Sequence, residues 1–171
     1  MGYKVVKIPS SYQTSPFFEN QKELKINVHA DVEENLKQTP FFYEFLYTIE
    51  EKEAYKPWER WDEHIPLLFK RWKKVNEQLA YHFRDRKIKQ IRSHMQEGIA
   101  LFIVFIHWMN EAAVKSTSIP LSYPFPYKPV NVEERLTFIV ENITLYHAFI
   151  QLSELFQEGE KIFYKKLALV N

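Results

Sequence analysis

The segment Gly98–Met109, GIALFIVFIHWM, constrains the fold more than any other part of this chain of 171 residues. Its uninterrupted apolar part ends at Ile106, and His107 follows. A helix that crosses a bilayer needs about 20 consecutive apolar residues, so this run is too short to be a membrane span. Polar residues also flank it, namely His94, Gln96 and Glu97 before it and Asn110 and Glu111 after it. We therefore expect a helix that is buried on nearly every side, in a protein without a membrane span.

A regular apolar stripe before this segment predicts a second long helix. Apolar residues recur there at spacings of three and four, as on one face of an α-helix: Ile65, Leu68, Trp72, Val75 and Leu79. One continuous helix from Pro66 to Val114 would be about 73 Å long, which is too long for a compact domain. The stripe loses its phase at the polar run 84–87, RDRK. We therefore predict a turn there and a central helix over about 85–114, with Asp85 as its N-terminal cap.

Helix start signals mark several of the remaining segments. Asp31 and Asn131 are each followed three residues later by a glutamate, which is the spacing of a capping box. Thr39-Pro40 also favours a helix start, because proline suits the first helical position. Residues 1–30 instead look irregular, and only the stretch 22–30, KELKINVHA, suggests a short strand or an extended arm.

Together these patterns predict one all-α domain. We expect an irregular N-terminal arm at 1–30 and a single helical domain at 31–171, in which five to seven helices surround the central helix. The chain has only 3 glycines, which disfavours a sandwich or barrel with many tight hairpins. Aromatic residues make up 16 % of the chain, so the core should be rich in rings. We interpret the clustered Trp58, Trp61 and Trp72 as core residues, the alternative being an exposed binding patch.

The chain contains no cysteine, which removes disulfides, thiolate metal sites and cysteine nucleophiles together. The first residues carry no apolar run of the length that a secretory signal peptide needs. We therefore expect a cytoplasmic protein.

The six histidines do not show the spacing of a helical metal site. No glutamate lies three residues before a histidine, and no two histidines are four residues apart. A site assembled from different helices, for example by His64, His107 and His147, is left open by this reasoning. We expect no bound metal and no cofactor, with the histidines as ordinary surface or partly buried residues.

The sequence holds no strong catalytic motif. His94 and Glu97 lie on one face of the predicted central helix, where they form either an acid–base pair or a plain surface pair. The chain has no glycine-rich phosphate loop and no Gly-x-Ser-x-Gly elbow. We therefore expect a protein that is not an enzyme.

Charge is distributed unevenly, although the net charge is only +1. Residues 17–63 carry a net charge of −6, whereas residues 70–92 carry +7. The candidate anion or nucleic-acid residues of this basic segment are Lys70, Arg71, Lys73, Lys74, Arg84, Arg86, Lys87, Lys89 and Arg92. Bases near the start of a helix favour an anion site. The alternative, which we favour at this point, is a basic surface that pairs with the acidic N-terminal segment.

Two aromatic stretches carry a resemblance to a known family. TPFFYEFLY at 39–47, followed by KPWERWDEHIPLLFKRW at 56–72, resembles the YpoC-like proteins of low-GC Gram-positive bacteria, which are small and uncharacterised. The resemblance covers most of the chain. It implies a bacterial, cytosolic, helical protein and brings no active site with it.

Three hypotheses for function follow from these patterns. The first is a non-enzymatic helical module that binds a protein partner or forms a homo-oligomer, suggested by the excess of aromatic residues and the lack of catalytic motifs. The second is nucleic-acid or phosphate binding through residues 70–92. The third is a metal-dependent hydrolase whose histidines converge within the bundle.

Overall fold

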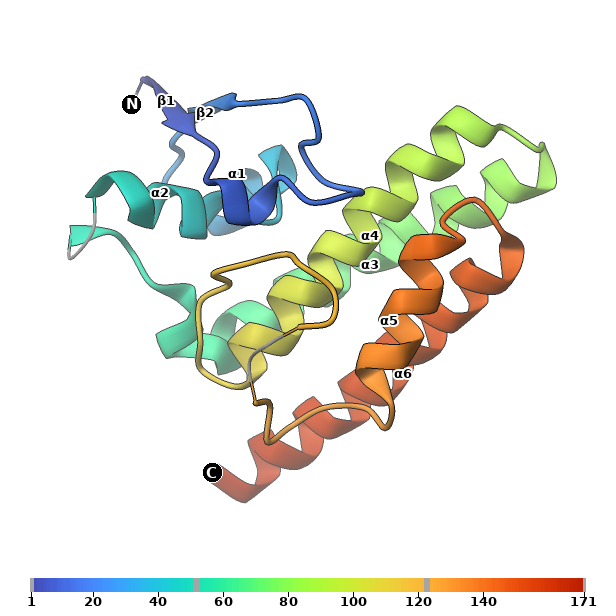
Figure 1. Cartoon of the computed structure of the whole chain (residues 1–171). Helices are drawn as coiled ribbons and strands as arrows, with labels where there is room; N and C mark the ends of the chain where they lie inside the picture. Colours follow the sequence, from blue (N-terminus) through green and yellow to red (C-terminus); the bar gives the residue numbers. More distant parts are fainter. Residues whose placement is uncertain (1, 51–52, 122–123, 171) are drawn as a thin grey trace.

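The computed structural model of the chain describes residues 2–50, 53–121 and 124–170. Its elements follow in the order β1 (Tyr3–Lys7), η1 (Ser10–Tyr12), β2 (Glu23–Asn27), α1 (Val32–Gln38), α2 (Phe42–Glu50), η3 (Pro57–Arg60), α3 (Trp61–Arg84), α4 (Ile88–Met109), α5 (Val132–Glu141) and α6 (Tyr146–Val170). Helices α3 and α4 form a hairpin through the middle of the molecule (Figure 1). The sheet with α1 and α2 lies on one side of this hairpin, and α5 with α6 lies on the other (Figure 1).

Helix α4 is the central element that the apolar run predicts. All residues from Gly98 to Met109 are buried in it. The helix is shorter than the predicted range of about 85–114, because its ends lie at Ile88 and Met109. The packing of α3, α6 and η3 against it explains why so long an apolar run has no solvent-facing side.

The predicted turn between the two long helices is present, but Asp85 has another role. Asp85 ends α3, and the first residue before α4 is Lys87, which offers no side-chain hydrogen bond to the helix. Arg86 adopts a left-handed conformation with φ 54°. The N–H of Arg86 donates to the Phe83 carbonyl and that of Lys87 to the His82 carbonyl, which is a Schellman motif. The chain therefore turns by a C-terminal cap of α3, and the predicted N-terminal cap by Asp85 is wrong.

The N-terminal segment contains a small sheet, which corrects the expectation of an irregular arm. β1 and β2 pair antiparallel, with Tyr3 opposite Asn27 and Lys7 opposite Glu23. The suggested strand within 22–30 is β2, whereas β1 was not predicted. Val6 and Ile26 are the buried residues of the two strands, and their burial fixes which face of the sheet meets the helices. The all-α prediction is therefore right for the body of the fold and misses this sheet.

The capping predictions for the shorter helices have mixed outcomes. The Asp31 carboxylate accepts from the Glu33 N–H at 2.8 Å, so Asp31 does cap α1. Asn131 precedes α5 in a left-handed conformation and makes no side-chain capping bond, so its capping box is not formed. Helix α6 runs unbroken through Gly159, which lies against the ring of Phe105 on α4.

Candidate functional site

The histidines that could have formed a metal site have separate surroundings. His64 shares a hydrogen bond of 2.5 Å with the Tyr55 hydroxyl, His107 donates from Nδ1 to the Ile103 carbonyl, and His147 is exposed. Burial lowers the pKa of His64, and it lowers the pKa of His107 to about 4. Within the described parts of the chain, no three histidine, aspartate or glutamate side chains gather closely enough to hold a metal ion.

The two members of the candidate acid–base pair on α4, His94 and Glu97, each bind other groups. Glu97 binds both Nε and Nη2 of Arg71, at 2.6 and 3.0 Å. His94 instead donates from Nδ1 to the Gln90 carbonyl, and its ring lies 4.9 Å from the ring of His82 on α3. The two side chains therefore do not act on one another.

The predicted basic residues fall into two groups. In the first group, Arg71 is neutralised by Glu97, and Lys70 lies 3.0 Å from Glu33 of α1. This second contact is the pairing with the acidic N-terminal segment that the charge pattern suggested. Lys73 and Lys74 are exposed on α3, and the structure shows no ion pair for either within its described residues.

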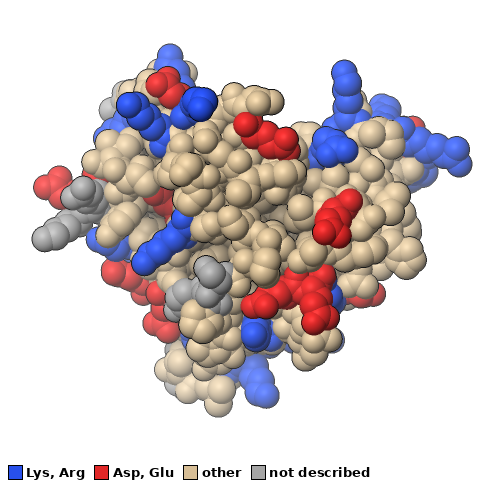
Figure 2. Space-filling view, viewed as in Figure 1, with Lys and Arg blue, Asp and Glu red and all other residues tan. Residues whose placement is uncertain are grey.

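The second group forms what we call the basic end: Arg84, Arg86, Lys87, Lys89 and Arg92. All five side chains are exposed, and none has a carboxylate within 4 Å among the residues described. Figure 2 shows blue side chains gathered at the upper right, over the α3–α4 turn of Figure 1. The first turn of α4 contains no acidic residue, so its free N–H groups add positive potential at the same place.

Rings and apolar side chains surround the basic end. Tyr81 is exposed, and the Lys87 ammonium lies 5.5 Å from the centre of its ring. Ile88 at the start of α4 and Tyr146 at the start of α6 are also exposed. Tyr146 contacts Phe83 of α3 at 5.4 Å, which places the α5–α6 turn beside this end of the hairpin. The basic end therefore offers both charge and contact area.

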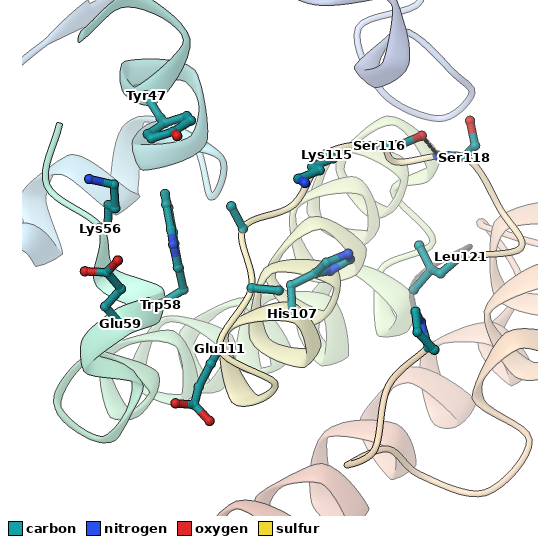
Figure 3. A pocket seen from close by; sticks show the side chains of 13 residues that line it. Tyr47, Lys56, Trp58, Glu59, His107, Glu111, Lys115, Ser116, Ser118 and Leu121 are labelled. Carbon is teal, nitrogen blue, oxygen red and sulfur yellow. Dashed lines mark hydrogen bonds between the residues drawn. The ribbon is translucent and has the colours of Figure 1, made fainter. Parts of the chain in front are cut away.

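A cavity lies near the other end of α4, about 30 Å away along the helix. It has a volume of about 530 Å³ and is bordered by α2, η3, the last turn of α4 and the segment 112–118. In Figure 3, Tyr47 and Trp58 stand on one side of this segment, and His107 and Leu121 on the other. The Tyr47 and Trp58 rings meet edge to face at 5.9 Å. The charged groups at its border are Lys56, Glu59, Glu111 and Lys115.

A buried carboxylate supports the wall of this cavity from behind. Oε2 of Glu44 on α2 accepts from Trp108 Nε1 at 2.8 Å and from the Val114 N–H at 3.2 Å. Oε1 has no hydrogen-bond partner in the described structure. Burial raises the pKa of Glu44 to about 7, although these two hydrogen bonds oppose the shift. The Tyr12 hydroxyl donates to the Val114 carbonyl from the same side.

The three clustered tryptophans are core residues, as predicted. Trp58, Trp61 and Trp72 are all buried, and Trp72 stacks on Phe156 of α6 at 4.3 Å. Neither Glu44 nor the segment 112–118 is predicted from the sequence. The one sequence feature that could have indicated Glu44 is its position as the only acidic residue in the aromatic stretch 41–47.

Comparison with known sequences adds a family. Residues 62–171 match the family described as YpoC-like protein. The chain is also 34 % identical over 142 residues to the protein named "Uncharacterized protein YpoC" of Bacillus subtilis (strain 168), covering 82 % of this chain and 85 % of that protein. No solved structure matches the chain. No helix in the described residues combines the length and the apolar character of a membrane span.

Proposed function

This chain belongs to the YpoC-like family, and we propose that it is a non-enzymatic binding protein whose basic end contacts the phosphates of a nucleic acid. The observation that carries this proposal is the set of five exposed bases without carboxylate partners in the described structure. Such bases gain free energy when they replace the counterions of a phosphate backbone.

The arrangement of the charges favours a chain of phosphates over a single small anion. Arg84 and Arg92 lie on different helices, and packed helix axes are about 8–10 Å apart. One small anion cannot contact bases spread over two helix ends and their turn. A polyanion can contact several of them at once, and the exposed ring of Tyr81 offers a surface on which a base can stack.

A protein partner or a second copy of the chain is the second candidate. The excess of aromatic residues first suggested it, but rings such as Trp58, Trp108 and Phe102 are buried and account for much of that excess. What still favours it is the exposed apolar area of Ile88, Leu145 and Tyr146 near the basic end. Such side chains are common in the contact area of protein interfaces.

Salt dependence and charge reversal test the proposal together. Binding to duplex DNA and to single-stranded RNA is measured by fluorescence anisotropy between 50 and 200 mM salt. About five phosphate contacts on a duplex predict a log–log slope near −4.5. The variant Arg86→Glu, Lys87→Glu and Lys89→Glu should lose this binding and keep its fold, because these residues lie outside the core.

The matched control reverses the same number of charges elsewhere. Lys128, Lys161 and Lys165 are exposed and lie outside the basic end, so replacing all three with glutamate gives the same change in net charge. We expect this variant to retain most of the binding. Equal losses in both variants, or no salt-sensitive binding by the native chain, would contradict a site at the basic end.

A further inference from the structure

Two residues of the segment 112–118, Ala113 and Lys115, border the cavity and have unpaired backbone groups in the described structure. Val114 uses its N–H and its carbonyl toward the interior, where they meet Glu44 and Tyr12. In an extended chain, alternate residues direct their backbone groups to opposite sides. Ala113 and Lys115 therefore direct theirs away from Glu44 and Tyr12. Neither residue has a backbone hydrogen bond anywhere in the described structure.

Both residues with unpaired backbone groups border the cavity. Ala113 and Lys115 line it together with Ala112, Ser116 and Ser118, whereas Val114 is buried and does not. The segment is also held firmly from behind, since the Thr117 N–H donates to the Ser11 carbonyl at 3.0 Å. An edge that is fixed on one side and unpaired on the other is a template for another strand.

The opposite wall of the cavity supplies a pocket for a side chain. Trp58 and Tyr47 form an aromatic corner that faces the segment across the cavity (Figure 3). The cavity volume of about 530 Å³ lies within the range of ligand sites, about 300–1,000 Å³. An aliphatic or aromatic side chain would gain free energy by leaving water for this corner.

The charged residues that border the cavity favour a particular type of side chain in a ligand. Glu111 lies 3.2 Å from the Lys166 ammonium, so its charge is already compensated. Lys115 is exposed and has no carboxylate partner in the described structure. Glu59, next to Trp58, is an exposed acid on the opposite wall, so an acidic side chain of the ligand complements the border where it lies beside Lys115.

We propose that the cavity between the Trp58–Tyr47 corner and the segment 112–116 binds an extended peptide of a partner protein by strand addition, with an apolar and an acidic side chain in the peptide. The backbone groups of Ala113 and Lys115 pair with the peptide backbone, and the corner takes the apolar side chain. This site is separate from the basic end and does not depend on it.

A displayed library of random seven-residue peptides is the probe for this site. It is selected on the native protein and counter-selected on Ala113→Pro, which lacks the backbone N–H at one pairing position. Losing one hydrogen bond of about 1.4 kcal/mol weakens binding about tenfold. We expect enriched peptides that bind the native chain about tenfold more tightly than the variant and that combine an apolar residue with an acidic one.

Two further variants keep the test decisive if Ala113→Pro does not fold. Lys115→Glu should weaken the selected acidic peptides, whereas Lys161→Glu, an exposed change on α6, should leave them unaffected. N-methylation of the best peptide should reduce affinity at alternate positions only, because every second N–H of a strand faces its partner.

Several results would overturn the proposal. They are a library without enriched peptides, equal binding to Ala113→Pro when that variant is folded, and insensitivity to N-methylation at every position. A native dimer that Ala113→Pro converts to a monomer would show that a second copy of the chain occupies the edge instead.

Discussion

The ammonium group of Lys166 lies 2.6 Å from the carbonyl oxygen of Met109, so the last helix caps the end of the central helix. The same ammonium lies 4.1 Å from the centre of the Trp61 ring and 4.8 Å from that of Tyr127. A positive charge at the C-terminal end of α4 also complements the helix dipole. Lys166 therefore joins α6, α4 and α3 through one buried group.

Replacing Lys166 with methionine should lower the free energy of unfolding by about 2–4 kcal/mol, because the Met109 carbonyl loses its partner and two rings lose a cation. Denaturant titration of both proteins measures this difference. The adjacent Lys165 is exposed, and Lys165→Met should change stability by no more than about 0.5 kcal/mol. If the two variants were equally stable, the buried contact would contribute nothing.

Gly159→Ala should destabilise the protein, although alanine is the better helix former. A Cβ atom at this position would lie 2.4 Å from Cε2 of Phe105, which is fully buried. Helix propensity favours alanine by about 1 kcal/mol, but overpacking costs about 1–3 kcal/mol. We expect a net loss of about 1 kcal/mol in thermal or chemical unfolding.

A second substitution identifies the cause of that loss. Phe105→Leu leaves room for the new methyl group, so the double variant should be more stable than the sum of the two single changes predicts. Strict additivity would mean that the ring of Phe105 is not the obstacle.

Glu44 should make stability fall as the pH rises. Its pKa is raised from 4.5 to about 7 in the folded chain, so between these values the folded state binds more protons than the unfolded state. The free energy of unfolding should therefore decrease from pH 4.5 to pH 7, by about 3 kcal/mol at 1.36 kcal/mol per pH unit. Glu44→Gln should remove this part of the pH dependence, as followed by denaturation at pH 5 and pH 8.

An exposed glutamate provides the comparison for Glu44. Glu141 lies at the end of α5, and Glu141→Gln should leave the pH profile almost unchanged. A native profile that rises from pH 5 to pH 8, and that Glu44→Gln does not alter, would show that the buried carboxyl is ionised throughout.

Arg86→Gly should stabilise the turn between α3 and α4. Arg86 has a φ of 54°, a conformation that glycine adopts without a steric penalty. Relief of the left-handed conformation, worth about 1–2 kcal/mol, exceeds the entropic cost of a glycine in the unfolded chain, so we expect a net gain of about 0.5–1 kcal/mol. If Arg86 also contacts a phosphate, the same change should make the salt slope of DNA binding shallower by about 0.9. A stabilised variant with an unchanged slope would remove Arg86 from the binding surface.

The sequence predicted the parts of the fold that depend on local periodicity. The stripe from Ile65 to Leu79 and the apolar run after Gly98 both repeat with the helical period, so α3 and α4 were foreseeable with the turn between them. The predicted caps failed at Asp85 and Asn131, where the backbone enters or leaves a helix through a left-handed residue. Side-chain type alone does not determine that conformation.

The candidate sites, like the fold, could be predicted only in part from the sequence. The basic residues were visible as charge, but only the fold separates the paired Lys70 and Arg71 from the unpaired basic end. The edge at 112–118 had no local signal. Its partners Ser11, Tyr12 and Glu44 are about 70 to 105 residues away in the chain, and no short-range pattern reports such contacts.

Those distant partners also set an order of events during synthesis. Tyr12, Phe41 and Phe45 form a ring cluster near the N-terminus, and Tyr12 bonds to Val114, 102 residues later. At a translation rate of about 5–20 residues per second, about 5–20 s pass between the synthesis of Tyr12 and that of Val114, which completes its contacts. During that interval the apolar surface of the ring cluster is open to other nascent chains. We therefore expect the yield of soluble protein to respond to chaperone supply and translation speed more strongly than its final stability would suggest.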